Sequence, residues 1–135
     1  MKLSFLKTFF KTFLTAGVLG LLSPNAASAA ELQIEDIEIG TGIAAADNDR
    51  LVVDYEGRLE DGTQFDSSYV QGEHFEFDLG QGQVIRGWDK GLWGMKVGGK
   101  RRLVIPPEMG YGGDDLGLIP PNSTLIFEIE LVKIR

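Results

Sequence analysis

Hydrophobic and polar residues alternate along much of this chain with the two-residue period of half-buried β-strands. The clearest run is 75–79, in which two phenylalanines and a leucine share one face. The closing run, 124–134, alternates in the same way and places glutamates on the opposite face. Further strands are expected over four segments: 32–39, 50–59, 63–65 and 100–105.

Details of these strands follow from the residues within and between them. The first strand is expected to be half-buried, with a bulge after Glu35 where the alternation slips. Asp61-Gly62 lies between two β-rich runs and predicts a hairpin. The basic triplet 100–102 is expected on a charged edge or a solvent face. A polar loop is expected from 66 to 74, and a long loop rich in glycine and proline from 108 to 123.

One segment, 84–93, has a helical period instead, because Val84, Trp88 and Leu92 recur every four residues. Its two internal glycines each cost about 1 kcal/mol relative to alanine in a helix. A helix this short does not persist alone in water, so it must pack onto the sheet, with the glycines permitting close approach. The predicted fold class is therefore α+β, an antiparallel sheet of five or six strands covered by one short helix.

The first 30 residues have a different character and predict a secretory signal peptide. Three lysines precede an apolar run at 12–22, and Ala27-Ser28-Ala29 fits a cleavage site, with a cut after Ala30 as the alternative. The apolar run is shorter than the ~20 residues of a spanning helix, so no stable membrane anchor is expected. The leader predicts an exported protein, in a bacterial periplasm or a thylakoid lumen.

Without its leader the chain is strongly acidic. Ten basic and all 20 acidic residues lie after position 30, which gives a formal net charge of −10. Such a charge argues against nucleic acid as a partner, because phosphate binding needs a basic surface. The chain has no cysteine, so no disulfide can stabilise it. No helix suited to dimerisation precedes the domain, and we expect a monomer.

The common catalytic constellations are missing from the sequence. There is no cysteine nucleophile, His74 is the only histidine, and no G-x-S-x-G motif occurs. No metal and no cofactor are therefore expected. What remains is a set of aromatic residues at strand and helix positions that must face one another: Tyr55, Phe65, Phe75, Phe77, Trp88, Tyr111 and Phe127.

These aromatic residues predict an apolar cleft that suits an uncharged peptide segment, with proline as the expected occupant. An ordinary core is the alternative for the whole set, and it is the favoured interpretation for Phe77. Trp88 and Tyr55 fit that alternative less well, because a buried indole N–H or phenol needs a hydrogen-bond partner. Asp66 ends a strand, where it either accepts a hydrogen bond from Tyr55 or caps the following loop.

Several segments, in this order and spacing, resemble the FKBP family of peptidyl-prolyl cis-trans isomerases, the immunophilins that bind macrolide drugs. The resemblance covers about residues 49–134 and rests on VDYEG at 53–57, DGTQFDSS at 61–68, FEFDLG at 75–80, VIRGWD at 84–89, GMKVGGKRR at 94–102, IPPEMGYG at 105–112 and IPPNSTLIF at 119–127. It implies a twisted half-barrel sheet wrapped on one short helix, with an isomerase domain over 48–135 and an N-terminal strand extension over 31–47.

The resemblance also implies a site. Its catalytic residues would be Tyr55, Asp66, Ile85, Trp88 and Tyr111, and its substrate-binding residues Phe65, Phe75, Val84, Leu118, Ile119 and Phe127. Trp88 would form the floor under the proline ring. The backbone N–H of Ile85 and the hydroxyl of Tyr111 would bond to ligand carbonyls.

The implied partners are proline-containing polypeptides, which this isomerase would help to fold after export, and macrolides as inhibitors. Two departures affect the rim of the site: the loop after Tyr111 is about one residue shorter than in common members, and Gln71 stands where some members carry a basic residue. The altered loop at 112–118 leaves open an alternative function, a binding or assembly module with little isomerase activity.

Overall fold

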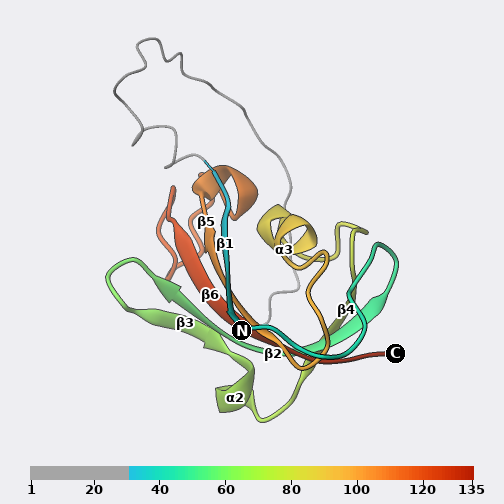
Figure 1. Ribbon diagram of the computed structural model, residues 1–135. Coiled ribbons are helices and arrows are strands. Elements are labelled where there is room, and N and C mark those ends of the chain that lie inside the picture. Colours follow the sequence, from blue (N-terminus) through green and yellow to red (C-terminus); the bar gives the residue numbers. More distant parts are fainter. Residues whose placement is uncertain (1–30) are drawn as a thin grey trace.

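The computed structural model describes residues 31–135, and the predicted signal peptide lies outside the described residues. Six strands form one antiparallel sheet in the order β1-β5-β6-β2-β3, and β4 pairs with β2 beside β3. The sheet curves around α3, as the predicted fold class requires (Figure 1). The elements are β1 Gln33–Glu38, β2 Arg50–Leu59, β3 Gln64–Ser67, α2 Ser68–Gln71, β4 Phe75–Asp78, α3 Arg86–Gly91, β5 Lys100–Ile105, the 3₁₀ turn η1 Pro107–Met109, and β6 Leu125–Ile134.

The two longest strands, β2 and β6, form the centre of the sheet and pair antiparallel with Tyr55 opposite Ile129. The first half of β2 pairs with β4 and the second half with β3, so the two short strands share one edge. The predicted apolar face of β6 is confirmed, since four alternate side chains of β6 are fully buried: Leu125, Phe127, Ile129 and Leu131.

Helix α3 lies in the hollow of the sheet because its glycines allow close contact with β5. A Cβ atom on Gly87 would lie 2.6 Å from Cγ2 of Ile105, and one on Gly91 would lie 2.8 Å from Cδ1 of Leu103. The predicted close approach is therefore confirmed. The helix spans 86–91 rather than 84–93, although the stripe of Val84, Trp88 and Leu92 is buried along its whole length.

Arg101 corrects the expectation that the basic triplet lies on a charged edge or a solvent face, because β5 lies between β1 and β6 in the sheet. Its side chain is largely buried and donates to Asp36 Oδ1 on β1 at 2.7 Å. It also donates to the carbonyl oxygens of Gly91 and Trp93 at 2.8 and 3.1 Å, at the C-terminal end of α3. A guanidinium there satisfies carbonyl groups that a helix end leaves without intrahelical partners.

The expected burial of the first strand was wrong, whereas its bulge is confirmed. All six residues of β1 are exposed, and the register against β5 shifts between Asp36 and Glu38. The reason is topological: β1 is an edge strand that pairs with β5 alone, so Ile34 and Ile37 remain 48% and 44% exposed. No helix in residues 31–135 is long and apolar enough to cross a membrane.

A short helix, α2, occupies part of the segment expected to be a polar loop. Ser67 caps it by accepting hydrogen bonds from the N–H groups of Tyr69 and Val70. Gly72 ends it in the left-handed conformation at φ 76°. This single turn follows β3 directly and fixes the position of Gln71, its last residue, relative to Asp66, the next-to-last residue of β3.

Candidate functional site

The indole of Trp88, on α3, lies at the centre of an aromatic cluster and is fully buried. Its ring centroid is 5.1 Å from that of Tyr55 and 5.2 Å from that of Phe127, and both rings meet it edge-on. Phe77 and Phe75 lie at 5.6 and 5.9 Å. Edge-on contacts of this kind add about 0.5–1.5 kcal/mol each beyond area burial, so the cluster is a rigid unit that joins α3, β2, β4 and β6.

Gly57 on β2 makes room for two more ring contacts in this cluster. A Cβ atom there would lie 2.7 Å from the rings of both Phe127 and Phe65, whose centroids are 5.5 Å apart. The residue was quoted in the resemblance but not expected to matter to the site. Its absent side chain is the only signal that the sequence offers, since glycine in a strand interior often marks a close approach.

The indole N–H of Trp88 is buried and has no hydrogen-bond acceptor among residues 31–135. Leaving a buried donor unpaired costs about 1–3 kcal/mol, and such groups are rare in native proteins. A donor of this kind at the centre of an aromatic cluster marks a place where a ligand or a water molecule can accept a hydrogen bond.

Asp66 accepts three hydrogen bonds, and two of them answer the question that the sequence left open. The hydroxyl of Tyr55 donates to Asp66 Oδ2 at 2.7 Å, while the N–H of Ser67 donates to Oδ1 at 2.9 Å. The predicted hydrogen bond from Tyr55 is therefore confirmed, whereas the helix that follows is capped by Ser67. The third donor is Nε2 of Gln71, which reaches Oδ1 at 2.8 Å. The aspartate is only 6% exposed, so this network is shielded from water.

Two buried tyrosine hydroxyls stay protonated in this environment. Burial, and then the hydrogen bond and charge of Asp66, raise the pKa of Tyr55 well above its ordinary value of 10.0. Burial and the charge of Asp66 raise the pKa of Tyr111 in the same direction. Both phenols are therefore hydrogen-bond donors throughout the physiological pH range.

The backbone at the start of α3 is also buried. Ile85 is the N-cap residue of the helix, and its carbonyl oxygen accepts from the N–H of Trp88 at 3.0 Å. The side chains of Val84 and Ile85 are 2% and 0% exposed. N–H groups at a helix start have no intrahelical acceptor, so this turn presents donors beside the aromatic cluster.

The structure brings most of the sequence-predicted site residues together. One buried cluster contains Tyr55, Phe65, Val84, Ile85, Trp88, Tyr111, Ile119 and Phe127, with Phe75 packed against it. Asp66 joins through Tyr55. Leu118 is the exception, because its side chain is 55% exposed on the loop before Ile119.

A second hydrogen-bond network supports the loop between β3 and β4. Ser68 Oγ accepts from the backbone N–H of Tyr55 and donates to Asp54 Oδ1, both at 2.9 Å. His74 Nδ1 lies 2.9 Å from the same oxygen of Asp54. The sequence showed His74 only as a loop histidine. In the structure it ties the segment that follows α2 to β2, the strand that carries Tyr55.

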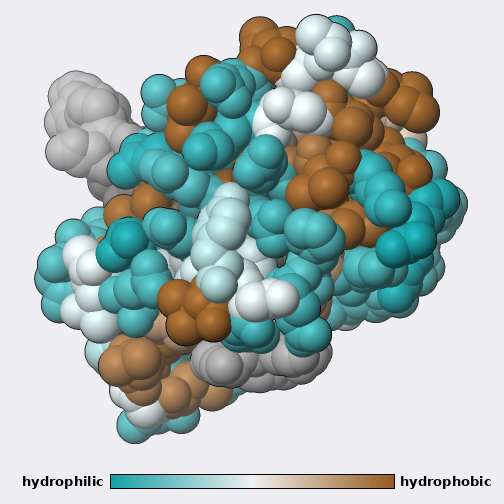
Figure 2. All heavy atoms as spheres, turned by 90° about the horizontal axis from the view of Figure 1, so that it is seen from below, coloured by the Kyte–Doolittle hydropathy of each residue, from teal (hydrophilic) through white to brown (hydrophobic). Residues whose placement is uncertain are grey.

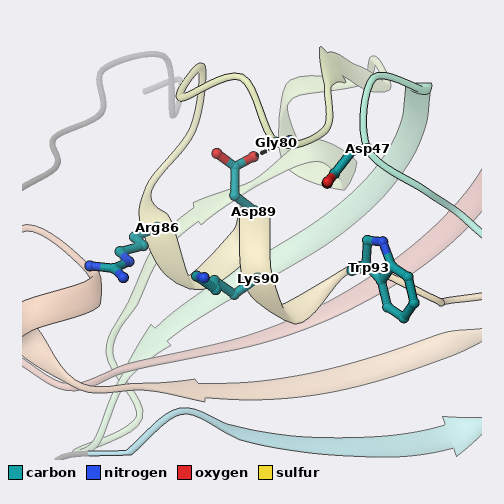
Figure 3. Close-up of a pocket in the computed structure, with 6 residues that line it drawn as sticks. All are labelled: Asp47, Gly80, Arg86, Asp89, Lys90 and Trp93. Atoms are coloured by element: carbon teal, nitrogen blue, oxygen red, sulfur yellow. Dashed lines mark hydrogen bonds between the residues drawn. The ribbon is translucent and has the colours of Figure 1, made fainter.

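Two cavities described in residues 31–135 lie away from the aromatic cluster. The larger, about 600 Å³, lies beside α3 and is lined by Asp47, Gly80, Arg86, Asp89, Lys90 and Trp93 (Figure 3). Its carboxylate Asp89 points to Gly80 and accepts the N–H of that residue at 2.8 Å, whereas Trp93 lies beyond the helix end. Burial raises the pKa of Asp89 despite this bond. The smaller cavity, about 380 Å³, is lined mainly by charged residues of β2, β5 and β6.

The molecular surface is largely hydrophilic on the face shown in Figure 2, with hydrophobic side chains gathered in separate groups. Some large hydrophobic side chains are exposed among residues 31–135, and the most exposed are Ile39 and Val70, at 71% and 77%. Single exposed hydrophobic residues are normal on proteins. Neither of the two cavities described above is lined by the aromatic cluster, so the predicted apolar cleft over Trp88 stays a prediction. The cluster is the candidate site because it gathers most of the predicted site residues.

The described residues thus form a curved antiparallel sheet around a short helix, with an indole at the centre of an aromatic cluster. Comparison with known proteins identifies the class of protein that has this arrangement. The family model described as FKBP-type peptidyl-prolyl cis-trans isomerase matches residues 42–132. The chain belongs to this family and to its isomerase enzyme class.

Relatives and solved structures agree with this assignment. The "FK506-binding protein" of Neisseria meningitidis serogroup B is 53% identical over 104 residues, which are 76% of this chain and 95% of that protein. FkpA of Escherichia coli K12, named an FKBP-type peptidyl-prolyl cis-trans isomerase, is 47% identical over 108 residues, which are 80% of this chain and 39% of that protein. The crystal structure of AtFKBP13 superposes with a TM-score of 0.72 at 40% identity, covering 77% of this chain and 93% of that one.

Proposed function

We propose that this isomerase accelerates the rotation of X–Pro bonds in exported proteins while they fold, and that it does so over the indole of Trp88. The observation that carries the proposal is the buried indole N–H, which has no acceptor within residues 31–135, at the centre of four other aromatic rings. A flat apolar floor with one donor suits a pyrrolidine ring joined to a carbonyl group.

The reaction needs no nucleophile and no metal. Rotation about an X–Pro bond breaks amide resonance, with a barrier of about 18–20 kcal/mol, and takes tens to hundreds of seconds unaided. The twisted amide has lost its charge separation, so a water-poor aromatic site disfavours the planar ground state more than the twisted one. The four aromatic rings around Trp88 would supply the apolar surroundings of such a site.

Donors around the indole would hold the substrate backbone while the prolyl bond turns. In this proposal the N–H of Ile85 and the hydroxyl of Tyr111 bond to the carbonyl groups that flank the rotating amide. Tyr55 and Asp66 act as a pair, because the hydroxyl donates to the carboxylate at 2.7 Å and each fixes the other. The raised pKa of Tyr111 supports its role as a donor.

Apolar side chains would form the walls of this pocket. Five of them are buried or half-buried around Trp88: Phe65, Phe75, Val84, Ile119 and Phe127. Leu118 lies 55% exposed at the rim, where it would contact substrate residues beyond the proline. One relative of this chain carries the name FK506-binding protein, and we extend the proposal to a macrolide of that type as a competitive inhibitor.

Activity is tested by NMR exchange spectroscopy on a short X–Pro peptide. The expected result is a cis–trans exchange rate that rises with enzyme concentration and falls to the uncatalysed rate when FK506 is added. No acceleration by protein shown to be folded by circular dichroism would contradict the proposed function. That outcome, with stable capture of unfolded polypeptides, would favour a binding module instead.

Export is tested separately, because it depends on the leader and not on the site. The basic and apolar pattern of residues 1–30 supports it. Expression of the full chain in a bacterium, followed by fractionation and N-terminal sequencing, should give a processed form beginning at Ala30 or Glu31. Retention of the unprocessed chain in the cytoplasm would contradict export and would leave the isomerase activity unaffected.

A further inference from the structure

Asp66 gives the candidate site a negative charge that no cation among residues 31–135 neutralises. None of the ion pairs within that part of the chain includes this carboxylate. Its hydrogen-bond donors are a phenol, a side-chain amide and a backbone N–H, from Tyr55, Gln71 and Ser67. All three are neutral, so they orient the carboxylate without cancelling its charge.

This charge acts at short range on the aromatic cluster. One hydrogen bond joins Asp66 to Tyr55, whose ring meets Trp88 with centroids 5.1 Å apart. The aspartate is 6% exposed, so little water lies around it to screen the field. Burial, and then the charge of Asp66, raise the pKa of Tyr111, which belongs to the same buried cluster.

Gln71 is the residue that leaves this charge in place. It ends α2, which the Ser67 cap and Gly72 hold in one turn, and its amide reaches Asp66 Oδ1 at 2.8 Å. A guanidinium at the same position would make an ion pair with the carboxylate and remove most of its field. The amide keeps the geometry of such a contact and omits the positive charge.

We propose that Gln71 makes this isomerase selective by charge, so that it favours X–Pro bonds preceded by a cationic or neutral residue and disfavours those preceded by an acidic one. This inference rests on the proposed function, because it assumes that substrate binds over Trp88. One unit of charge on X changes kcat/KM by about tenfold if it lies about 10 Å from the carboxylate at an effective dielectric constant of about 20.

The test compares three blocked peptides that differ only in X, which is lysine, glutamine or glutamate. NMR exchange spectroscopy gives kcat/KM for each without a coupling protease that has preferences of its own. The expected order for the wild type is lysine, then glutamine, then glutamate, and the ratio of the first to the last should shrink in 1 M NaCl. Equal values for the three peptides would overturn the inference.

Substitutions at position 71 test whether Gln71 is responsible for the charge selectivity. Gln71→Arg should bring the lysine-to-glutamate ratio close to one, whereas Gln71→Met, which removes the donor but adds no charge, should retain it. Gln33→Arg makes the same charge change on the exposed edge strand β1, at the opposite side of the sheet, and should also retain it. An equal fall in the ratio for Gln71→Arg and Gln33→Arg would assign the effect to net charge and overturn the role of Gln71.

Two further measurements distinguish a failure of this inference from a variant that does not fold and from a failure of the proposed function. If Gln71→Arg does not fold, Asp66→Asn tests the same claim by removing the charge itself, and an unchanged lysine-to-glutamate ratio would overturn the inference. The glutamine peptide carries no charge and reports the isomerase activity alone. Absence of its acceleration by the wild type defeats the proposed function, whereas acceleration without charge selectivity defeats only this inference.

Discussion

The ring of Tyr55 meets the indole of Trp88 nearly edge-on, with centroids 5.1 Å apart and planes at 81°, while its hydroxyl donates to Asp66 at 2.7 Å. One side chain on β2 thus joins the aromatic cluster to the buried carboxylate. The same residue contributes both packing and polarity to the site, and a substitution can separate the two.

Tyr55→Phe should retain the ring contact with Trp88 and lose the hydrogen bond. Hydrogen bonds to charged groups contribute about 1.5–3 kcal/mol, and the buried carboxylate of Asp66 would lose one. We expect a fall of about that size in the free energy of unfolding, measured with urea. Tyr69→Phe is the control, because that tyrosine is 52% exposed and the loss of its hydrogen bond to Glu130, 3.3 Å long, should matter little. Equal effects of the two substitutions would contradict this account.

Gly87→Ala should destabilise the protein although alanine favours helices. The new Cβ atom would meet Ile105 at 2.6 Å, in a contact that a packed core cannot absorb without movement. Overpacking of this kind costs about 1–3 kcal/mol, which exceeds the gain of about 1 kcal/mol in helix propensity. Thermal unfolding measures the difference. Gly113→Ala is the matched control, since no atom lies within 4 Å of that Cβ position, and a variant at Gly87 as stable as this control would refute the close contact.

Periodicity predicted the strands of the sheet well because burial on one face imposes it directly. In β6 every second side chain from Leu125 to Leu131 is fully buried, as the alternation required. The burial of β1 could not be predicted in this way, since it depends on how many strands flank it. Ile34 alternates like a core residue and yet lies on an edge strand, 48% exposed.

The polar parts of the site were harder to predict for a different reason. Helix α2 has four residues, too few to show a period, and depends on the Ser67 cap and the left-handed Gly72. The sequence left two roles open for Asp66, and the carboxylate accepts from Tyr55 and from the N–H of its neighbour Ser67, while Ser67 caps the helix that follows. Such contacts depend on distances in space that spacing along the chain does not encode.

Trp88→Phe should reduce kcat/KM for an X–Pro peptide by about tenfold or more, equivalent to at least about 1.4 kcal/mol of transition-state stabilisation. The smaller ring offers less floor to the proline and removes the buried N–H. Trp93→Phe is the control, because that indole is 59% exposed and lies outside the aromatic cluster. Equal activity of the two variants would contradict the placement of the site.

The two tryptophans also give a spectroscopic test of burial that does not depend on activity. Trp93 is 59% exposed, whereas Trp88 is fully buried. Iodide should therefore quench the fluorescence of Trp88→Phe, in which only Trp93 remains, much more than that of Trp93→Phe. FK506 should change the emission of Trp93→Phe alone. Strong iodide quenching of Trp93→Phe would show that the indole at position 88 is open to solvent.

Stability should fall at alkaline pH because folding raises the pKa of buried tyrosines. Burial, and then the hydrogen bond and charge of Asp66, raise the pKa of Tyr55 above 10.0, and burial, and then the charge of Asp66, raise that of Tyr111. A group whose pKa is raised by folding contributes stability that is fully present below the unfolded value and is lost as pH rises. From pH 10 upward the unfolded chain releases these protons while the folded chain keeps them.

The contribution of these tyrosines to the free energy of unfolding should therefore be constant up to about pH 9 and decline above pH 10. Each tyrosine should lower the free energy of unfolding by up to about 1.4 kcal/mol per pH unit. Urea unfolding at pH 8, 9, 10 and 11 measures the decline for the whole protein. Lysines titrate in the same range, so the decisive quantity is the difference between the wild type and Tyr55→Phe. That variant lacks one of the titrating phenols and should lose less stability between pH 10 and 11. Parallel curves would show that Tyr55 ionises as readily in the folded protein as in the unfolded chain, which its hydrogen bond to Asp66 opposes.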